Sequence, residues 1–286
     1  MRTKKQMMDL ILTFAHRDER IRAVAMNGSR LDENITPDRF QDYDVVYFVR
    51  EMDSFLADPA WVDYFGPRII MQTPEDGRLF PPELGGWYTY LMLFEDENRI
   101  DLMLIPTSDI QRYCKADTLT KVLLDKDGLF PALPAPSDAM YHIKRPSADQ
   151  YAGCCNEFWW VSTYVAKGLC RRKIHYAIWH LNQCLREELL RMLSWQVGIQ
   201  TDFSLSVGKC YQNLPYYLEE ETGALLLSAS RQDSEAACWD ALFAMCTLFS
   251  EASRFVAEGL GFAPPQEEEG VRQYLQRLFE AYPPRP

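Results

Sequence analysis

The chain has 286 residues, of which 47% are hydrophobic and 25% charged, so it is long enough for one large or two ordinary folded domains and is not a disordered chain. Its formal net charge of −11 argues against a nucleic-acid partner, which would favour a basic surface, and suits a small cationic ligand. The sequence contains no run of about 18 apolar residues, so no membrane span is predicted. The apolar stretch near the start of the chain is too short and too mixed for a secretory signal. Eight cysteines without a Cys-x-x-Cys pair indicate reduced thiols, and together these features predict a cytoplasmic protein.

The first half of the chain alternates helical and strand patterns. Apolar residues at helical spacing predict a helix over 7–16, and two strands over 87–94 and 99–105 flank a short acidic turn, which predicts a β-hairpin. Other strands are predicted from β-branched and aromatic runs, with less regular segments between them. These strands cover 21–26, 43–49, 68–71 and 121–124, and the irregular or short helical segments cover 54–65 and 108–113.

Prolines are frequent over residues 130–146, which cannot continue a helix or a central strand, so this segment is interpreted as a domain connector. Beyond it the patterns become long and helical. Helices are predicted over 149–169, 173–197, 214–227, 233–260 and 267–282. The sequence therefore predicts an α+β protein, with a mixed β-sheet and flanking helices in residues 1–135 and a helical bundle in residues 136–286.

Two acidic residues stand at the start of the strand over 43–49. Asp42 and Asp44 are separated by one residue, so on a strand both side chains would point to the same face. Neighbouring carboxylates in a buried sheet repel each other unless a cation lies between them, and Mg²⁺ prefers oxygen ligands. Asp101, in the otherwise apolar strand over 99–105, would close a metal site for phosphoryl or nucleotidyl transfer; alternatively it reaches solvent at the end of the hairpin.

A small-residue turn follows the strand over 21–26. Gly28 allows the backbone to approach a phosphate closely, and the N–H groups and the Ser29 hydroxyl can donate hydrogen bonds to it. Arg30 would add charge-assisted contacts. This turn therefore predicts a binding site for a triphosphate beside the carboxylates.

The order Gly28-Ser29, then Asp42-Tyr43-Asp44, then Asp101 on a later strand resembles the nucleotidyltransferase superfamily of the DNA polymerase β type. Longer stretches resemble the aminoglycoside 6-adenylyltransferases, the streptomycin-modifying enzymes, and this resemblance runs from the first helix to about residue 200. The stretches are Gln41-Asp42-Tyr43-Asp44, Arg99-Ile100-Asp101-Leu102, Leu123-Leu124-Asp125-Lys126-Asp127, Asn156-Glu157-Phe158-Trp159 and Tyr164-Val165-Ala166-Lys167-Gly168-Leu169.

The resemblance implies that residues 1–135 are a nucleotidyltransferase domain and that ATP is the co-substrate. The triphosphate would bind at Gly28 and Ser29, with Mg²⁺ at Asp42 and Asp44. A hydroxyl of an aminoglycoside, first of all the 6-position of streptomycin, would attack the α-phosphorus and pyrophosphate would leave, giving antibiotic resistance. Asp101 would be either a third metal ligand or the base that accepts the hydroxyl proton, and the sequence leaves both roles open. We expect a monomer, although the sequence does not determine the oligomeric state.

The helical half would supply the antibiotic pocket and further ATP contacts. Trp160 and Lys167 share a face of the helix over 149–169, and Lys167 would meet the β- and γ-phosphates of ATP unless it is a solvated surface lysine. Glu157 and Tyr164 lie on a neighbouring face. Glu157 would bind an ammonium or guanidinium group of the drug, or else form a structural ion pair with Arg171 or Lys173 elsewhere in the bundle. Glu157, Trp160 and Tyr164 are therefore the expected substrate-binding residues.

Two other functions remain open from the sequence. The chain would be a nucleotidyltransferase for a different small hydroxyl acceptor, or a homologue that binds a nucleotide or another ligand without turnover. The presence of all three acids, Asp42, Asp44 and Asp101, together with the Gly28-Ser29 turn favours an enzyme.

Overall fold

The computed structural model describes residues 1–285 and divides the chain into two compact units, residues 1–140 and the residues from Tyr141 onward. The boundary lies within the proline-containing segment that the sequence predicts as a connector. Each unit has its own hydrophobic core, so each is described by itself. Among the described residues, no helix is long and apolar enough to cross a membrane.

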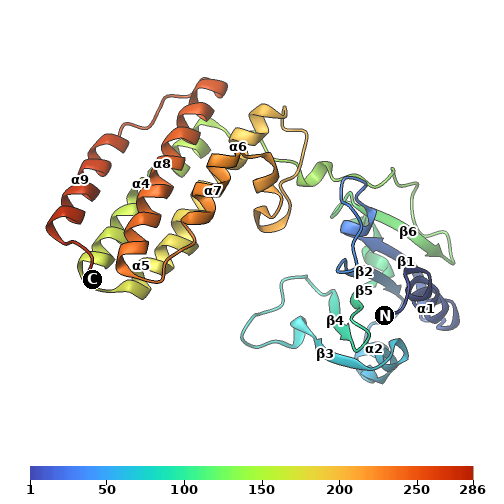
Figure 1. Cartoon of the computed structure of the whole chain (residues 1–286). Coiled ribbons are helices and arrows are strands. Elements are labelled where there is room, and N and C mark those ends of the chain that lie inside the picture. Colours follow the sequence, from blue (N-terminus) through green and yellow to red (C-terminus); the bar gives the residue numbers. More distant parts are fainter. Residues whose placement is uncertain (286) are drawn as a thin grey trace. The chain divides into compact units, whose positions relative to one another are not determined.

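The first unit contains a mixed six-stranded sheet in the order β3-β4-β5-β2-β1-β6 (Figure 1). Neighbouring strands are antiparallel except β2 and β5, which run parallel. The predicted strands, including the hairpin, are confirmed. Their bounds are β1 Ile21–Asn27, β2 Tyr43–Val49, β3 Arg68–Gln72, β4 Tyr88–Phe94, β5 Arg99–Pro106 and β6 Thr120–Asp125.

Helix α1 (Lys4–Arg17) covers one face of this sheet. It begins with a capping box, in which Thr3 and Gln6 exchange side-chain and backbone hydrogen bonds. Its buried stripe packs into the larger core of the unit, where the Tyr47 hydroxyl donates to the Ile11 carbonyl over 2.7 Å. The short helices of the unit are α2 (Asp53–Leu56), α3 (Ile110–Tyr113) and the 3₁₀ turns Ser29–Leu31, Pro59–Phe65, Pro74–Asp76 and Thr107–Asp109.

The opposite face of the sheet carries a smaller core. Ala25 and Val46 lie in this core and are themselves register partners on β1 and β2. Trp87, at the start of the hairpin, and Tyr113, on α3, pack over them. Because this second core covers only part of the face, the ends of β2 and β5 on the same face are left for polar residues.

The second unit is the predicted helical bundle (Figure 1). Its helices are α4 Ala148–Cys170, α5 Ile174–His180, α6 Arg186–Gln200, α7 Glu220–Ser228, α8 Glu235–Leu260 and α9 Glu268–Ala281. Phe158 on α4 stacks on Phe249 on α8, with ring centroids 3.8 Å apart and an interplanar angle of 5°. Both rings belong to one large apolar core and are fully buried.

Two predicted helices differ from the structure. The helix predicted over 173–197 contains a π-helical turn at Leu181–Leu185 between α5 and α6. The helix predicted over 214–227 is a 3₁₀ turn at Leu214–Tyr217, an extended residue at Leu218, and then α7. Pro215 has no N–H to donate, so it fits the first turn of a short helix better than the interior of a long one.

Candidate active site

The Gly28 turn lies directly against the Asp44 carboxylate. Strand β1 ends at Asn27, which is the register partner of Asp44 on β2, and Gly28 follows with a φ of 79°. A Cβ at residue 28 would collide with the Asp44 carboxylate, so only glycine fits here on both steric and conformational grounds. The small-residue turn and the acidic pair therefore form one packed group.

Asp44 and Asp101 are register partners on the parallel strands β2 and β5, so their side chains emerge on the same face of the sheet. Asp42 lies one residue before β2, which corrects the expectation that Asp42 and Asp44 share a strand. The carbonyls of Gln41 and Asp42 are instead bound by Arg30, which donates from Nη2 (2.5 Å) and Nε (2.7 Å) respectively. The structure thus brings Asp44 and Asp101 together through the sheet and Asp42 through the preceding loop.

The acidic group is partly removed from water. Burial, followed by repulsion from Asp101 and Asp42, raises the pKa of Asp44 to about 6. Burial also raises the pKa of Asp42. Both carboxyl groups are therefore costly to ionise in the isolated protein, and a nearby cation would lower that cost.

One such cation is Arg99, which the sequence analysis did not place in the site. Its Nε and Nη2 donate to the two oxygens of Asp101 over 2.7 and 2.8 Å, and Nε lies 3.6 Å from Oδ2 of Asp42. The signal was present in the sequence, because Arg99 and Asp101 are separated by one residue on a strand and so share a face. The guanidinium therefore lies close to both Asp101 and Asp42.

The three carboxylates Asp42, Asp44 and Asp101 are the candidate ligands for a metal ion. They supply the hard oxygen ligands that Mg²⁺ prefers, and burial and mutual repulsion raise the pKa of Asp44, so a bound cation would favour its ionised form. Within residues 1–285, however, no three His, Cys, Asp or Glu side chains are gathered closely enough to hold a metal ion as they stand. The chemistry of Asp42, Asp44 and Asp101 fits a divalent cation, provided that Arg99 releases Asp101.

Arg30 is held inside the loop that carries Asp42. Besides its two carbonyl contacts, its guanidinium lies 3.7 Å above the ring of Tyr43. Gln41 strengthens the same connection, because its Nε2 donates to the Ser29 carbonyl over 3.1 Å. In this structure Arg30 therefore fixes the path from the Gly28 turn to Asp42, and a contact of Arg30 with phosphate stays a prediction.

The predicted residues of the helical unit form a group on α4. Trp160 is 58% exposed, and its Nε1 donates to the Tyr164 hydroxyl over 2.8 Å. The Lys167 ammonium lies 4.6 Å from the centre of the Tyr164 ring. Glu157 is exposed and forms no ion pair with Arg171 or Lys173 among the described residues. The group offers aromatic faces and one carboxylate, and its role in binding stays a prediction.

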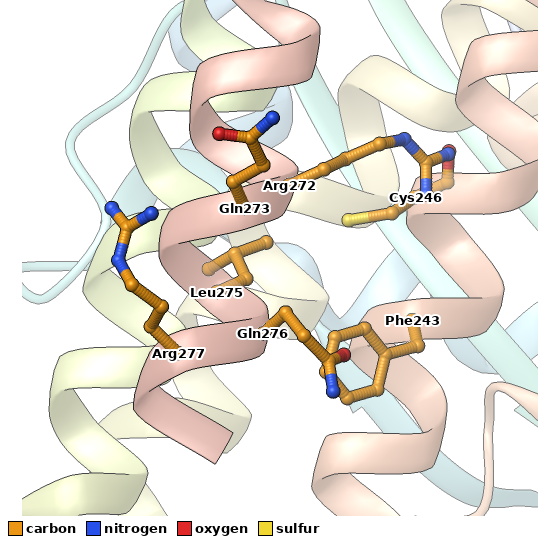
Figure 2. A pocket seen from close by; sticks show the side chains of 7 residues that line it. All are labelled: Phe243, Cys246, Arg272, Gln273, Leu275, Gln276 and Arg277. Atoms are coloured by element: carbon orange, nitrogen blue, oxygen red, sulfur yellow. The ribbon is translucent and has the colours of Figure 1, made fainter. Parts of the chain in front are cut away.

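A cavity of about 520 Å³ lies between α8 and α9 in the helical unit. Figure 2 shows Arg272 extending from α9 toward Cys246 on α8, while Arg277 points away. Arg272 donates to the Cys246 carbonyl over 2.7 Å and to the Ser250 hydroxyl over 2.5 Å. Among the described residues no carboxylate lines this cavity, and Arg272 already joins the two helices, so the cavity does not resemble the acidic site on the sheet.

Comparison with known proteins shows the family to which the chain belongs. The family model described as streptomycin adenylyltransferase matches residues 1–278. The chain is 46% identical to an aminoglycoside 6-adenylyltransferase of Bacillus subtilis (strain 168), over 98% of this chain and 99% of the relative. The chain belongs to the streptomycin adenylyltransferase family. This confirms the resemblance carried by the motifs, and as a member of this family the chain is a nucleotidyltransferase.

Further members of the streptomycin adenylyltransferase family are similar over their whole lengths. The relatives from Campylobacter jejuni and Staphylococcus aureus, both named aminoglycoside 6-adenylyltransferase, are 44% and 38% identical, and the matches cover 98–99% of this chain and 98–100% of the relatives. A crystal structure of an aminoglycoside 6-adenyltransferase from Bacillus subtilis matches 98% of this chain and 99% of its own, with 42% identity and a TM-score of 0.49.

Proposed function

We propose that this enzyme transfers AMP from ATP to a hydroxyl group of an aminoglycoside in the cytoplasm, with the 6-position of streptomycin as the first candidate. The observation that carries the proposal is the pairing of Asp44 and Asp101 across β2 and β5, directly beside the Gly28 turn. The acidic group therefore lies directly against a backbone turn, and only a glycine in that turn allows so close an approach. The relatives' names supply the acceptor class.

In the proposed reaction, the acceptor oxygen forms a bond to the α-phosphorus of ATP, and the bond between the α-phosphorus and the bridging oxygen breaks, so that pyrophosphate leaves. The Gly28 and Ser29 turn would hold the triphosphate through its N–H groups. Asp42 and Asp44 would hold Mg²⁺, which when bound would neutralise charge on the phosphates. Arg99 would leave Asp101 when the metal binds, because both cations need the same oxygens.

The proposal is tested by incubating the protein with ATP, Mg²⁺ and single aminoglycosides while following pyrophosphate release. Release with streptomycin, and a mass increase of the drug by one adenylyl group, is the expected result. Release only with a different acceptor would keep the chemistry and change the substrate. No release with any aminoglycoside would contradict the proposed function.

One further measurement distinguishes the two proposed roles of Asp101, metal ligand and base. If Asp101 is a metal ligand, Asp101→Asn weakens the thermal stabilisation that Mg²⁺ and ATP give together. If Asp101 is the base that accepts the hydroxyl proton, the same variant keeps this stabilisation and loses only turnover. Asp42→Asn serves as the control that loses both.

A further inference from the structure

A polar row continues across the sheet beyond the acidic pair. The register sets Asp101 on β5 opposite Asp44 on β2. Asp44 is in turn the partner of Asn27 on β1, and Asn27 is the partner of Thr120 on β6. Register partners on neighbouring strands present their side chains on the same face of a sheet. Asn27 and Thr120 therefore lie on the face that carries the carboxylates, one and two strands beyond Asp44.

The side-chain amide of Asn27 is fully hydrogen-bonded. Its Nδ2 donates to Oγ1 of Thr120 over 2.7 Å, to the Leu119 carbonyl over 3.3 Å and to Oδ2 of Asp117 over 3.4 Å. Its Oδ1 accepts from the Tyr113 hydroxyl over 2.6 Å. Because a backbone carbonyl and a carboxylate can only accept, the nitrogen must face them, and this fixes the orientation of the amide.

Tyr113, which donates to this amide, is itself held rigidly. It is the last residue of α3, is only 3% exposed and belongs to the smaller core of the sheet unit. Its ring packs edge-on against Phe48, with ring centroids 4.9 Å apart. Burial raises the pKa of the Tyr113 hydroxyl, so the group keeps its proton at neutral pH and remains a donor. Asn27 is therefore bound from α3 on one side and from the start of β6 on the other.

None of these hydrogen bonds involves Asp44, although Asn27 lies opposite it on the next strand. Residues directly opposite each other on antiparallel strands have Cβ atoms about 4.5–5.5 Å apart, so a freely rotating amide at residue 27 would reach the carboxylate. In the structure the amide nitrogen is engaged on the β6 side instead. The Asp44 carboxylate accepts no hydrogen bond among the described residues, and it stays open to a cation.

Asn27 also fixes the start of the Gly28 turn, because the two residues share a peptide bond. Gly28 lies so close to Asp44 that a side chain there would collide with the carboxylate. Backbone N–H groups bind a phosphate only at hydrogen-bond distance and with good alignment, so the turn must be held in place. The amide of Asn27 anchors it from the side of β1 that faces β6, away from β2.

We propose that Asn27 is a positioning residue for the transfer reaction: held by Tyr113 and Thr120, it sets the Gly28 turn for the triphosphate and keeps its own amide away from Asp44. It acts through the turn and the carboxylate, without touching ATP itself. The inference deepens the proposed function and rests on it, because it assumes that ATP and a cation bind here. A purely structural network would change the stability of the fold and leave nucleotide binding unchanged.

The test removes the two sides of this network separately in the full chain. Tyr113→Phe keeps the ring and removes only the hydroxyl, and Asn27→Ala removes the amide. The matched control is Tyr47→Phe, a buried tyrosine of the same sheet whose hydroxyl donates to the Ile11 carbonyl in the core on the other face. Each variant is characterised by its thermal midpoint, by calorimetric titration with Mg²⁺ and a non-hydrolysable ATP analogue, and by the KM values for ATP and streptomycin.

We expect Tyr113→Phe to raise the Kd of the analogue and the KM for ATP about three- to tenfold, and Asn27→Ala to raise them about tenfold or more. The KM for streptomycin should stay within about twofold of the wild type in both. Tyr47→Phe should lower the thermal midpoint as Tyr113→Phe does, with all binding constants within about twofold of the wild type. Because Tyr113 acts through Asn27, adding Tyr113→Phe to Asn27→Ala should change the Kd by less than about twofold.

Unchanged nucleotide constants in both Tyr113→Phe and Asn27→Ala would overturn the inference, whatever happens to the thermal midpoint. An equal effect of Tyr113→Phe with and without the Asn27 amide would overturn it as well, because Tyr113 would then act by another route. If Asn27→Ala does not fold, Tyr113→Phe decides by the difference between its ATP and streptomycin constants. A wild type that binds the analogue with Mg²⁺ but turns over no aminoglycoside would instead contradict the proposed function, and the calorimetric comparison would still decide the role of Asn27.

Discussion

The two units of the chain differ in their buried polar groups, although both hold some without a hydrogen-bond partner, such as Thr89 Oγ1 in the sheet unit and Trp239 Nε1 in the bundle. In the helical unit, buried hydroxyls are satisfied within their own helix: Ser162 donates to the carbonyl of Trp159, and Ser250 donates to that of Cys246. In the sheet unit, burial and mutual repulsion raise the pKa of Asp44, and the Thr89 hydroxyl has no partner among the described residues. Polar groups that cost stability are frequent at functional sites. The raised pKa of Asp44 therefore supports the proposal that the chemistry takes place on the sheet unit, while the bundle is organised around one large apolar core.

The strongest test of this comparison removes the acidic pair. Asp42→Asn and Asp44→Asn should each lower kcat by about a thousandfold or more, because a neutral amide is a poor ligand for Mg²⁺. The fold should survive, and Asp44→Asn should not lower the thermal midpoint at neutral pH, since the variant no longer buries a charge. Retained turnover in either variant, measured by pyrophosphate release, would remove the assignment of the site.

A variant in the bundle tests whether that unit contributes packing rather than chemistry. Phe249→Ala removes one ring of the stacked pair with Phe158 and should lower the free energy of unfolding by about 3–5 kcal/mol. Denaturant unfolding measures this loss, and the kcat of the folded fraction should stay close to the wild type. Phe255→Ala, at a ring that is 38% exposed, is the control and should cost less. A large fall in kcat without a loss of stability would show that the bundle takes part in the chemistry.

A smaller effect is expected from the guanidinium at the acidic site. Arg99→Gln removes the cation that binds both oxygens of Asp101, so Mg²⁺ no longer competes with it. The Mg²⁺ concentration that gives half of the maximal thermal stabilisation should fall about three- to tenfold, as for the loss of one charge-assisted interaction. Arg68→Gln, whose ion pair with Asp63 lies elsewhere in the unit, is the control. A higher Mg²⁺ requirement in Arg99→Gln would show that Arg99 assists binding instead.

The last prediction concerns a charge that only stabilises the sheet unit and leaves activity unchanged. Hydrogen bonds from Arg2 hold the pKa of Asp96 well below its usual range. A carboxyl whose pKa is lowered by folding contributes stability above its unfolded pKa, near 4, and loses it as the pH falls through the folded value. Asp96→Asn should therefore lower the free energy of unfolding by about 1–3 kcal/mol at pH 7, with the difference from the wild type shrinking below about pH 4.

Thermal unfolding across this pH range measures the effect, and turnover at pH 7 should be unchanged. Asp9→Asn, at the exposed pair with Lys5, should give no measurable change at any pH. A pH-independent loss of stability in Asp96→Asn would show that packing, rather than charge, is what Arg2 and Asp96 contribute.

The sequence by itself determined the elements and the kind of site. Local periodicity predicted the strands, the hairpin and the bundle, because side chains repeat every second residue on a strand and about every 3.6 residues on a helix. The acidic residues, and a glycine after the first strand, were likewise visible as residue types at a characteristic spacing. The π turn within the predicted helix over 173–197 was not visible, since its residues have ordinary helix propensities.

Only the tertiary structure decided which of these groups meet. The parallel pairing of β2 with β5 joins strands more than 50 residues apart and sets Asp44 opposite Asp101. The same register brings Arg99, which already pairs with Asp101 on its own strand, within 3.6 Å of Asp42. A shift of one residue would turn every one of these side chains to the other face of the sheet. Register depends on contacts between distant segments, so the pattern along one strand does not contain it.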